Sequence, residues 1–389
     1  MKKKIAILGS TGSIGKTLLN IIDENKEIFQ VNLLSANKNY KKILKQALKF
    51  KVKNIIIHDL KTFEKNKNLF LKKKINVFNN INDFKKSKKI KLDYTMIGII
   101  GFFGLRPTLD VIEITKKIAI ANKESIICGW NLIKKKLKKS KTEFLPIDSE
   151  HFSINELIKN KNKDDIQKIY LTASGGPFLK KKITNNNKIK ISDAVKHPTW
   201  RMGKKISIDS ATLINKVYEI IEAKKIFNMD YSKLDILIQP TSYVHSIVEF
   251  YGGTIHYLTH RPSMKIPIFN SIMFNSKNRK KIITNVDYKL INDLNISEVP
   301  LNKFPIKKIL KILPKKDSLF ETVLVSVNDT LVDLFLKKKI HFHQIHSNLY
   351  KILNLKKFSI YKKKTPKNIR EIKDLYEFVR LKTESLSVV

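Results

Sequence analysis

Lys4-Ile-Ala-Ile-Leu8 runs into Gly9-Ser-Thr-Gly-Ser-Ile-Gly15 and then into Lys16-Thr-Leu-Leu-Asn-Ile-Ile22. The short apolar run predicts a β-strand, the spaced glycines predict a tight turn, and the spacing after them is typical of a helix. Glycine lets the backbone approach a pyrophosphate closely, and a helix N-terminus offers free N–H groups to phosphate. The stretch therefore favours a dinucleotide-binding βαβ start over a glycine turn without a ligand.

Further apolar runs extend this pattern through the first part of the chain. They lie at 31–35, 54–58, 94–98 and 117–121, and polar segments of helical length separate them. Strands that alternate with helices form parallel sheets covered on both faces. We therefore expect an α/β fold with an N-terminal Rossmann-like, doubly wound parallel sheet over residues 1–148.

The pattern changes from about residue 144. Strand candidates at 143–147, 169–172, 234–238 and 246–250 are separated by loops rich in Gly, Pro, Ser and His, which predicts a central α/β catalytic domain over 149–273. Residues 274–300 have little periodicity and are expected to be a linker. Helical spacing at 318–336, 342–353 and 369–381 predicts a C-terminal α-helical bundle over 301–389.

The charge balance raises nucleic-acid binding as one interpretation. The chain of 389 residues has 77 Lys and Arg against 34 Asp and Glu, a formal net charge of +43. Only six of these cations are arginine, whose planar fork suits phosphates and base edges, and the lysines are spread over every segment. Basic residues interleaved with aromatic ones are not found either. We therefore favour solvated lysine-rich faces and expect no nucleic-acid partner.

Composition also bears on the compartment. The single cysteine, Cys128, cannot form an intramolecular disulfide, which fits a reducing environment. The apolar run after Met1 is too short for a secretory signal, and the longest nearly uncharged stretch, 94–105, is too short to span a bilayer. We expect a cytoplasmic protein without a membrane partner.

The end of the second strand indicates which dinucleotide is bound. An NAD enzyme usually has an acidic residue there to hold the ribose hydroxyl groups. This chain has Ser35-Ala-Asn-Lys-Asn39 instead, which contains no carboxylate. Lys38 and the asparagine amides can pair with a 2′-phosphate, so NADPH is favoured, although Lys38 alone is weak support in so lysine-rich a chain.

Two acidic segments suggest a metal site. Asp148-Ser-Glu150 places two carboxylates on one side of an extended backbone, where they can hold one hard divalent cation. Such pairs are also common on surfaces, and a third ligand is needed. Glu219 is a candidate, because Asn215 and Glu219 are spaced to share one helix face.

The same region contains a candidate phosphate site. Asp209 or Ser210 fits the N-cap of the predicted helix, and Lys216 follows Asn215 directly. A hydroxyl, an amide and an ammonium near a helix start can hold a phosphate. The competing interpretation is a capped amphipathic helix with exposed charges.

Two loops and one histidine complete the candidates. Ala173-Ser-Gly-Gly-Pro177 offers the Ser174 hydroxyl and free N–H groups to an anion. His197-Pro-Thr-Trp200 combines a titratable ring with a large aromatic one, as loops that close over ligands often do, although a buried structural tryptophan is equally consistent. His245 borders a strand, where an isolated histidine is more often structural than catalytic.

Taken together, these segments resemble one family, the 1-deoxy-D-xylulose 5-phosphate reductoisomerases. The similarity covers essentially the whole chain in order. It rests on Gly9–Gly15, Ala121-Asn-Lys-Glu-Ser125, Pro146-Ile-Asp-Ser-Glu-His151, Leu171–Pro177, His197-Pro-Thr-Trp-Arg-Met-Gly203, Asp209-Ser-Ala-Thr, Asn215-Lys216 with Glu219, and Met264-Lys-Ile-Pro-Ile268.

The resemblance implies an NADPH- and metal-dependent rearrangement and reduction of 1-deoxy-D-xylulose 5-phosphate to 2-C-methyl-D-erythritol 4-phosphate, in isoprenoid precursor biosynthesis. It implies a homodimer joined through the central domain and a small sugar phosphate as substrate. The implied metal is Mg²⁺ or Mn²⁺, with Co²⁺ as a further candidate, held by Asp148, Glu150 and Glu219.

Roles for the remaining residues follow from the same resemblance. The implied catalytic residues are Lys123, Glu150, His197, Glu219 and His245. The implied substrate contacts are Ser149, Glu150, Ser174, His197, Trp200, Ser210, Asn215, Lys216 and Glu219, with Trp200 on a covering flap. The implied cofactor contacts are Ser10, Thr11, Gly12, Ser13, Ile14, Asn37, Lys38, Asn39, Asn122, Lys123, Glu124, Met202 and Gly203, with Met202 facing the nicotinamide.

The chain also differs from the family's usual sequence at three motifs. It has Gln239-Pro-Thr-Ser242 where His-Pro-Gln-Ser is usual, Pro262-Ser-Met264 where Pro-Asp-Met is usual, and Asn328-Asp329 where Asn-Glu is usual. None of these replaces an implied ligand. A semialdehyde-type dehydrogenase would share the glycine turn but needs a nucleophilic cysteine, and Cys128 lies in an apolar context suited to packing.

Overall fold

The computed structural model describes residues 1–87, 90–180, 189–200, 202–273 and 288–387. It divides into two compact units. The first comprises the described parts of Met1–Ile126, Trp130–Asp148 and Met264–Ile282, and the second those of Ile127–Gly129, Ser149–Ser263 and Ile283–Val389. These two units do not test the predicted division into four domains, which stays a prediction.

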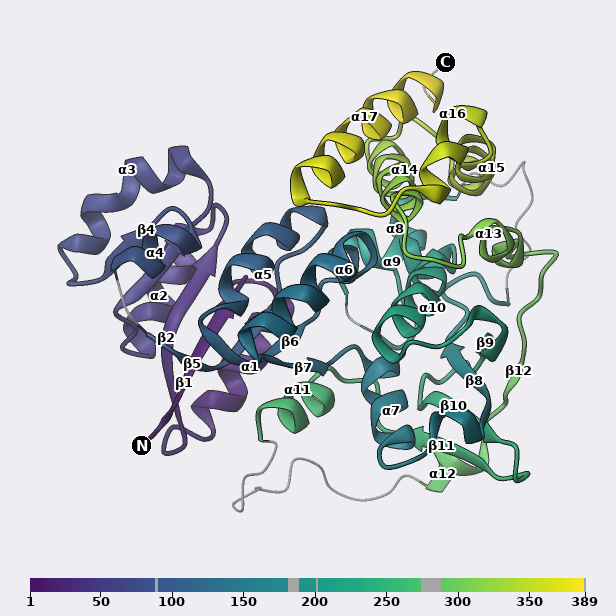
Figure 1. Ribbon diagram of the computed structural model, residues 1–389, viewed down its shortest axis with the longest axis horizontal. Helices are drawn as coiled ribbons and strands as arrows, with labels where there is room; N and C mark the ends of the chain where they lie inside the picture. Colours follow the sequence, from purple (N-terminus) through teal and green to yellow (C-terminus); the bar gives the residue numbers. More distant parts are fainter. Residues whose placement is uncertain (88–89, 181–188, 201, 274–287, 388–389) are drawn as a thin grey trace. The chain divides into compact units, whose positions relative to one another are not determined.

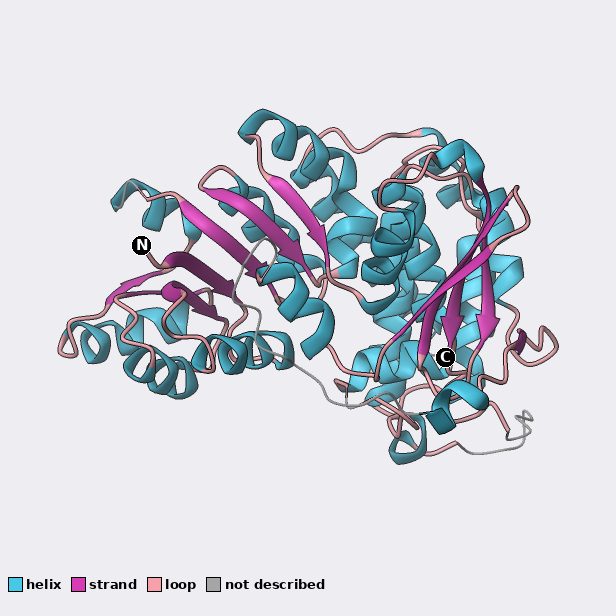
Figure 2. Ribbon diagram, turned by 90° about the horizontal axis from the view of Figure 1, so that it is seen from below, coloured by secondary structure: helices cyan, strands magenta, loops and turns pink. Residues whose placement is uncertain are grey.

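A seven-stranded parallel sheet organises the first unit. Its order is β4-β3-β2-β1-β5-β6-β7, and Figure 2 shows helices on both of its faces. From β1 the chain adds strands β2 to β4 on one side and then returns to add β5 to β7 on the other. Doubly wound sheets bind ligands at this point between β1 and β5. The strands are β1 (Lys3–Leu8), β2 (Phe29–Ala36), β3 (Asn54–Ile57), β4 (Asn76–Phe78), β5 (Leu92–Ile97), β6 (Thr115–Ile120) and β7 (Glu143–Pro146).

Helices cover this sheet because each has an apolar stripe. They are α1 (Ser13–Asp23), α2 (Tyr40–Lys49), α3 (Leu60–Leu71), α4 (Ile81–Ser87), α5 (Leu105–Ile112), α6 (Lys123–Ser140) and α11 (Lys265–Ile272), with a 3-10 turn at Phe102–Gly104. The core joins sequence-distant segments, since Ile5, Ile22 and Ile268 belong to one buried cluster. Burying such side chains is worth roughly 1.5–3 kcal/mol each.

The glycine turn after β1 has a steric cause. Gly9 has φ +85°, and a Cβ there would lie 2.6 Å from the carbonyl oxygen of Gly98. A Cβ on Gly15 would lie 2.5 Å from Cα of Ser10. A side chain at Gly9 would push the turn away from Gly98 after β5, and one at Gly15 would push α1 away from the turn at Ser10. The turn keeps its shape because both residues are glycine.

A five-stranded mixed sheet organises the second unit. Its order is β11-β10-β8-β9-β12, in which β8 and β9 are parallel and the other pairs are antiparallel. The strands are β8 (Ile166–Ala173), β9 (Leu234–Ile238), β10 (Val244–Phe250), β11 (Ile255–Thr259) and β12 (Ser297–Glu298). The helix α7 (Ser149–Ile158) packs on β10 and β11, and α10 (Ile214–Phe227) packs on β8 and β9.

Helices dominate the remainder of this unit. In Figure 1, α15 (Phe342–Leu353), α16 (Lys356–Ser359) and α17 (Ile369–Ser387) lie beside α14 (Phe320–Leu336), which is buried on nearly every face. The others are α8 (Ile191–Ala194), α9 (Lys204–Ala211), α12 (Tyr288–Asn292) and α13 (Ile306–Ile312), with 3-10 turns at Lys163–Asp165, Tyr231–Lys233 and Ile360–Lys363. None of the helices that the structure describes has the length and apolar character needed to cross a membrane.

The predicted α/β fold class is confirmed, including the parallel sheet, the second sheet and the C-terminal helices. Sequence reasoning missed the short strands β4, β11 and β12. Half of the predicted linker, residues 274–287, lies outside the described residues; its remainder contains α12 and β12.

Candidate active site

Three carboxylates meet where β7 leads into α7. Asp148, Glu150 and Glu219 each offer an oxygen atom, and these atoms all lie within 4.8 Å of one another. Asp148 is the last residue of one segment of the first unit, and Ser149 alone separates it in the chain from Glu150. Glu219 comes from α10 and is buried. Three carboxylate oxygens are a donor set that suits a hard divalent cation such as Mg²⁺.

The Lys216 ammonium is bound between two of these carboxylates. Its Nζ lies 2.5 Å from Oε1 of Glu150 and also pairs with Glu219, one turn along α10. Burial disfavours the charged ammonium, but Glu150 and Glu219 outweigh this and raise the pKa of Lys216. A protonated lysine therefore supplies one of the positive charges that the acidic cluster needs.

The third carboxylate has its own cation. Nζ of Lys123, at the start of α6, donates to Oδ2 of Asp148. The Asn122 side chain fixes this helix start, because it caps the Ser125 N–H at 2.6 Å and donates to the carbonyl of Gly101 at 2.7 Å. Two lysines and three carboxylates leave one net negative charge, which a divalent cation would reverse.

Two further side chains hold these ligands in place, and the sequence analysis did not assign them a role. Nε2 of His151 is 2.9 Å from the backbone oxygen of Glu219, and the Ser246 hydroxyl donates to the backbone oxygen of Glu150 at 3.0 Å. They tie α7 to α10 and to β10. The position of His151 directly after Glu150 was the only signal in the sequence.

The structure corrects two local expectations. Asp148 and Glu150 do not share an extended segment, because α7 begins at Ser149 and only Asp148 precedes it. Asp209 and Ser210 do not cap a helix, because both lie in the last turn of α9, and α10 begins after Leu213 with φ 57°. Apolar residues on both sides of this left-handed turn conceal it in the sequence. The expected shared face of Asn215 and Glu219 is confirmed, since the Asn215 amide donates to Glu219.

Ser174 and His197 form the next part of the site. Oγ of Ser174 lies 3.0 Å from Nε2 of His197. The N–H groups of Thr199 and Trp200 donate to Nδ1 at 3.2 and 3.0 Å, which fixes the ring. Burial, reinforced by the charge of Lys216, lowers the pKa of His197 to about 4. The ring is therefore neutral at neutral pH, with Nε2 protonated and directed at the serine.

Trp200 lies against a pair of stacked histidines. Its ring is 6.1 Å from that of His245, which stacks on His260 at 3.7 Å. Nε2 of His245 is 3.0 Å from the backbone oxygen of His260. Burial, with His245 nearby, lowers the pKa of His260 to about 3. His260 is a neighbour that the sequence did not indicate. The catalytic role that the resemblance implied for His245 stays a prediction.

Most of the predicted cofactor residues lie near the ends of β1, β2 and β6 in the first unit, and Met202 and Gly203 belong to the second unit. Ser10 is buried and donates to Gln46 of α2 at 2.8 Å. Asn39 caps α2 by accepting from the Lys42 N–H at 3.2 Å. Lys38 is exposed and lies 3.8 Å from Asp59. The turn and the start of α1 contain Thr11, Gly12, Ser13 and Ile14, the end of β2 leads to Asn37, α6 contains Glu124, and Met202 and Gly203 precede α9.

Models of three protein families match consecutive parts of the chain. They are 1-deoxy-D-xylulose 5-phosphate reductoisomerase over residues 5–129, the C-terminal domain of 1-deoxy-D-xylulose 5-phosphate reductoisomerase over 144–227, and the DXP reductoisomerase C-terminal domain over 260–382.

Individual relatives agree with these matches. The 1-deoxy-D-xylulose 5-phosphate reductoisomerase of Pelagibacter ubique is 53% identical over 99% of this chain and 100% of its own length. That of Sulfurihydrogenibium sp. is 37% identical over 90% of each chain. The Zymomonas mobilis enzyme solved with NADPH is 29% identical, with a TM-score of 0.86 over 100% of this chain and 99% of that one. A DOX-P reductoisomerase solved with NADPH, fosmidomycin and magnesium is 28% identical, with a TM-score of 0.89 over 98% of each.

Proposed function

The chain belongs to the 1-deoxy-D-xylulose 5-phosphate reductoisomerase family, and from that premise we propose how its own residues carry out the family's reaction. The enzyme uses NADPH and Mg²⁺ to convert 1-deoxy-D-xylulose 5-phosphate to 2-C-methyl-D-erythritol 4-phosphate, a step of isoprenoid precursor biosynthesis. The single observation that supports the residue assignment best is the cluster of Asp148, Glu150 and Glu219.

These three carboxylates are proposed to hold the divalent cation, with Mn²⁺ as an alternative to Mg²⁺. When bound, the cation polarises the substrate carbonyl and stabilises negative charge on the substrate oxygens. His151 and Ser246 hold the backbone of Glu219 and Glu150, so the ligands are preorganised. The side chain of Glu219 is buried, so bulk solvent has little access to this ligand.

Lysines next to the carboxylates are proposed to orient the substrate. Lys123 and Ser149 lie beside Asp148 and Glu150, where an ammonium and a hydroxyl can donate to the substrate's hydroxyl and carbonyl oxygens. Lys123 has a second role at this point, since its position at the start of α6 also places it near the predicted cofactor residues Asn122 and Glu124.

The substrate phosphate is proposed to bind Ser174, Ser210, Asn215 and Lys216, with His197 as a neighbour. Neutral His197 donates from Nε2, which orients the Ser174 hydroxyl without adding charge. The first turn of α10 contains Asn215 and Lys216 and adds helix N–H groups. Binding at the phosphate, away from the bonds that change, can be used to order the covering loop.

That loop contains Trp200, which is proposed to cover the substrate while His245 supports its ring. Met202 and Gly203 follow and are proposed to contact the nicotinamide. When bound, NADPH supplies the hydride that reduces the rearranged aldehyde. Gly12 at the N-cap of α1 has no side chain to cap the helix, which leaves that end for the pyrophosphate beside Thr11, Ser13 and Ile14, and Lys38 with Asn37 and Asn39 is proposed to hold the 2′-phosphate.

The oligomeric state and the cellular location are proposed from the family and the composition. The enzyme is proposed to be a homodimer, which sedimentation at micromolar concentration would test against the 45.2 kDa chain mass. A cytoplasmic location is proposed because the chain has one buried thiol, Cys128, and no disulfide among the described residues.

Turnover after removal of one ligand tests the assignment. The Glu219→Gln variant keeps the size of the side chain but loses its charge, so we expect at least about 10³-fold slower NADPH oxidation with unchanged NADPH binding. Chelator should abolish wild-type activity, and Mg²⁺ should restore it. The control is Glu156→Gln on α7, an exposed glutamate outside the cluster, which should retain full activity. Near-normal turnover of Glu219→Gln would refute the ligand role.

A further inference from the structure

We propose that Asn328 and Asp329 of α14 are positioning residues for the phosphate-binding turn between α9 and α10. They would act through Asp209 and Lys205 of α9, none of which contacts the substrate in the proposed function. The inference rests on that function, since it assumes that Ser210, Asn215 and Lys216 bind the substrate phosphate.

The buried carboxylate of Asp209 is the centre of this arrangement. Asn328 donates from Nδ2 to Oδ1 of Asp209 at 2.7 Å, and Nζ of Lys205 lies 3.0 Å from Oδ2. Each carboxylate oxygen therefore has its own partner, and one of them comes from the C-terminal helices. Asp209 is 2% exposed and Asn328 is fully buried, so water cannot replace a lost partner.

A second layer fixes Lys205. Its Nζ lies 2.9 Å from Oδ1 of Asp329, and the Tyr376 hydroxyl of α17 donates to Oδ2 of Asp329 at 2.9 Å. Burial, with the charge of Asp329, raises the pKa of Tyr376, so its hydroxyl stays protonated and can donate. The Lys205 ammonium also lies 5.5 Å from the ring centre of Tyr218 on α10.

The hydrogen bonds and ion pairs around Asp209 act on the proposed phosphate-binding residues through the peptide bond between Asp209 and Ser210. Asp209 directly precedes Ser210, α9 ends at Ala211, and α10 begins at Ile214 after the left-handed residue Leu213. A rotation of Asp209 would therefore move the Ser210 hydroxyl relative to Asn215 and Lys216. A displacement of about 1 Å at such a site can cost about 100-fold in rate.

Other ties between these helices provide controls, because they do not reach Asp209. The Ser326 hydroxyl of α14 donates to the backbone oxygen of Tyr376 at 2.6 Å. Ser326 is as fully buried as Asn328 and lies two residues before it. A change at Ser326 removes a bond to the backbone of Tyr376, but it leaves the Tyr376 hydroxyl on Asp329 and both partners of the Asp209 carboxylate in place.

The first experiment replaces Asn328→Asp, which places a second carboxylate against Asp209. We expect the KM for 1-deoxy-D-xylulose 5-phosphate and the inhibition constant of inorganic phosphate to rise together by about tenfold or more, while NADPH binding is unchanged. The Ser326→Ala control should change both constants by less than about twofold.

Exchange of the amide and the carboxylate between positions 209 and 328 tests whether the two constants can be restored. The double variant Asp209→Asn with Asn328→Asp restores one amide and one carboxylate with the donor direction reversed, and should return both constants to within about threefold of wild type. Where Asn328→Asp does not fold, Asn328→Ser replaces the amide by a shorter hydroxyl that does not span the distance to Asp209, and it should raise the phosphate inhibition constant by a smaller factor.

Unchanged constants in Asn328→Asp and Asn328→Ser, or a double variant no better than its parent, would overturn the positioning role. The Ser210→Ala variant separates this from failure of the proposed function. If Ser210→Ala raises the KM but the Asn328 variants do not, only the positioning role is wrong. If Ser210→Ala has no effect either, the phosphate assignment itself is wrong.

Discussion

At the scale of single residues, the Lys216 ammonium cannot bind the carboxylates and the substrate phosphate fully at the same time. It pairs with Glu150 and Glu219 in the structure, and it is also the proposed ligand of the substrate phosphate. A cation bound by the same carboxylates would weaken these ion pairs and free the ammonium for the phosphate. Metal and substrate are therefore expected to promote each other's binding.

The Lys216→Met variant tests this competition. Without the ammonium, Glu150 and Glu219 repel each other and attract a cation more strongly, so Mn²⁺ binding without substrate should tighten by about tenfold. The KM for the sugar phosphate should rise in the same variant. Free Mn²⁺ measured by electron paramagnetic resonance gives the affinity, and Lys224→Met on the same helix is the control. Weaker Mn²⁺ binding by Lys216→Met would show that the lysine does not compete.

Spacing alone predicted only local contacts, whereas the approach of Glu219 to Asp148 and Glu150 was offered as a candidate third ligand and implied by the family resemblance. Asp148 with Glu150 and Asn215 with Glu219 are four residues apart or fewer, so their proximity could be read directly. The contacts of His151 with Glu219 and of Asn328 with Asp209 join residues 68 and 119 positions apart. Such pairs depend on how helices pack, which periodicity does not specify.

At the scale of elements, the β1–α1 turn is the most constrained segment. Strand, glycines and helix all point to the same structure, and the steric limits at Gly9 and Gly15 explain why the sequence could specify it. The turn at 209–214 was misjudged for the opposite reason. Its left-handed residue is Leu213, which has no sequence signature, whereas glycine or asparagine would have indicated a break.

The Gly15→Ala variant tests the constraint on the turn. Its Cβ would lie 2.5 Å from Cα of Ser10, so the turn must shift. We expect a loss of about 1–3 kcal/mol in unfolding free energy and a KM for NADPH raised by about tenfold or more. Chemical denaturation and NADPH titration measure both. Gly252→Ala, where no atom lies within 4 Å of the added carbon, should change neither, and an unaffected Gly15→Ala would contradict the account.

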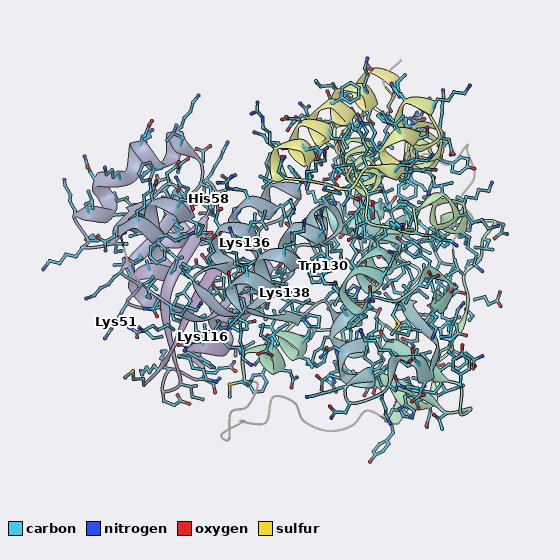
Figure 3. The ribbon with its side chains drawn as sticks, viewed as in Figure 1. Lys51, His58, Lys116, Trp130, Lys136 and Lys138 are labelled. Atoms are coloured by element: carbon cyan, nitrogen blue, oxygen red, sulfur yellow. The ribbon has the colours of Figure 1, made fainter. Side chains whose placement is uncertain are left out.

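At the scale of the whole molecule, the assignment of the lysine excess to solvated faces stays a prediction, since Lys123, Lys216 and Lys225 are buried whereas other lysines are exposed. Lys51 in the turn after α2, Lys116 of β6 and Lys138 of α6 are exposed. Figure 3 labels these three side chains. The absence of a nucleic-acid partner stays a prediction. The fold class could be predicted from hydrophobic periodicity alone. The division into units could not, because residues 264–273 return to pack with the first unit although they follow the second sheet in the chain.

Several histidines should make the whole molecule sensitive to acid. Burial lowers the pKa of His58, His197 and His346 to about 4, below the value of about 6.5 expected in the unfolded chain. The unfolded state therefore binds more protons between these limits, so stability is complete above about pH 6.5 and is lost as the pH falls toward 4. Each histidine contributes about 3 kcal/mol at most.

Urea denaturation between pH 7 and pH 4.5 measures this dependence. The midpoint should fall with pH, and His346→Gln should flatten the curve. A midpoint that is constant or rises on acidification would contradict the burial of neutral rings.

Location of the cation tests the central claim most directly. Crystals of the enzyme grown with Mn²⁺ and NADPH would be measured at the manganese absorption edge. We predict one anomalous peak per chain, within about 2.5 Å of oxygen atoms from Asp148, Glu150 and Glu219 together. A peak elsewhere, or one that Glu219 does not contact, would contradict the proposed site.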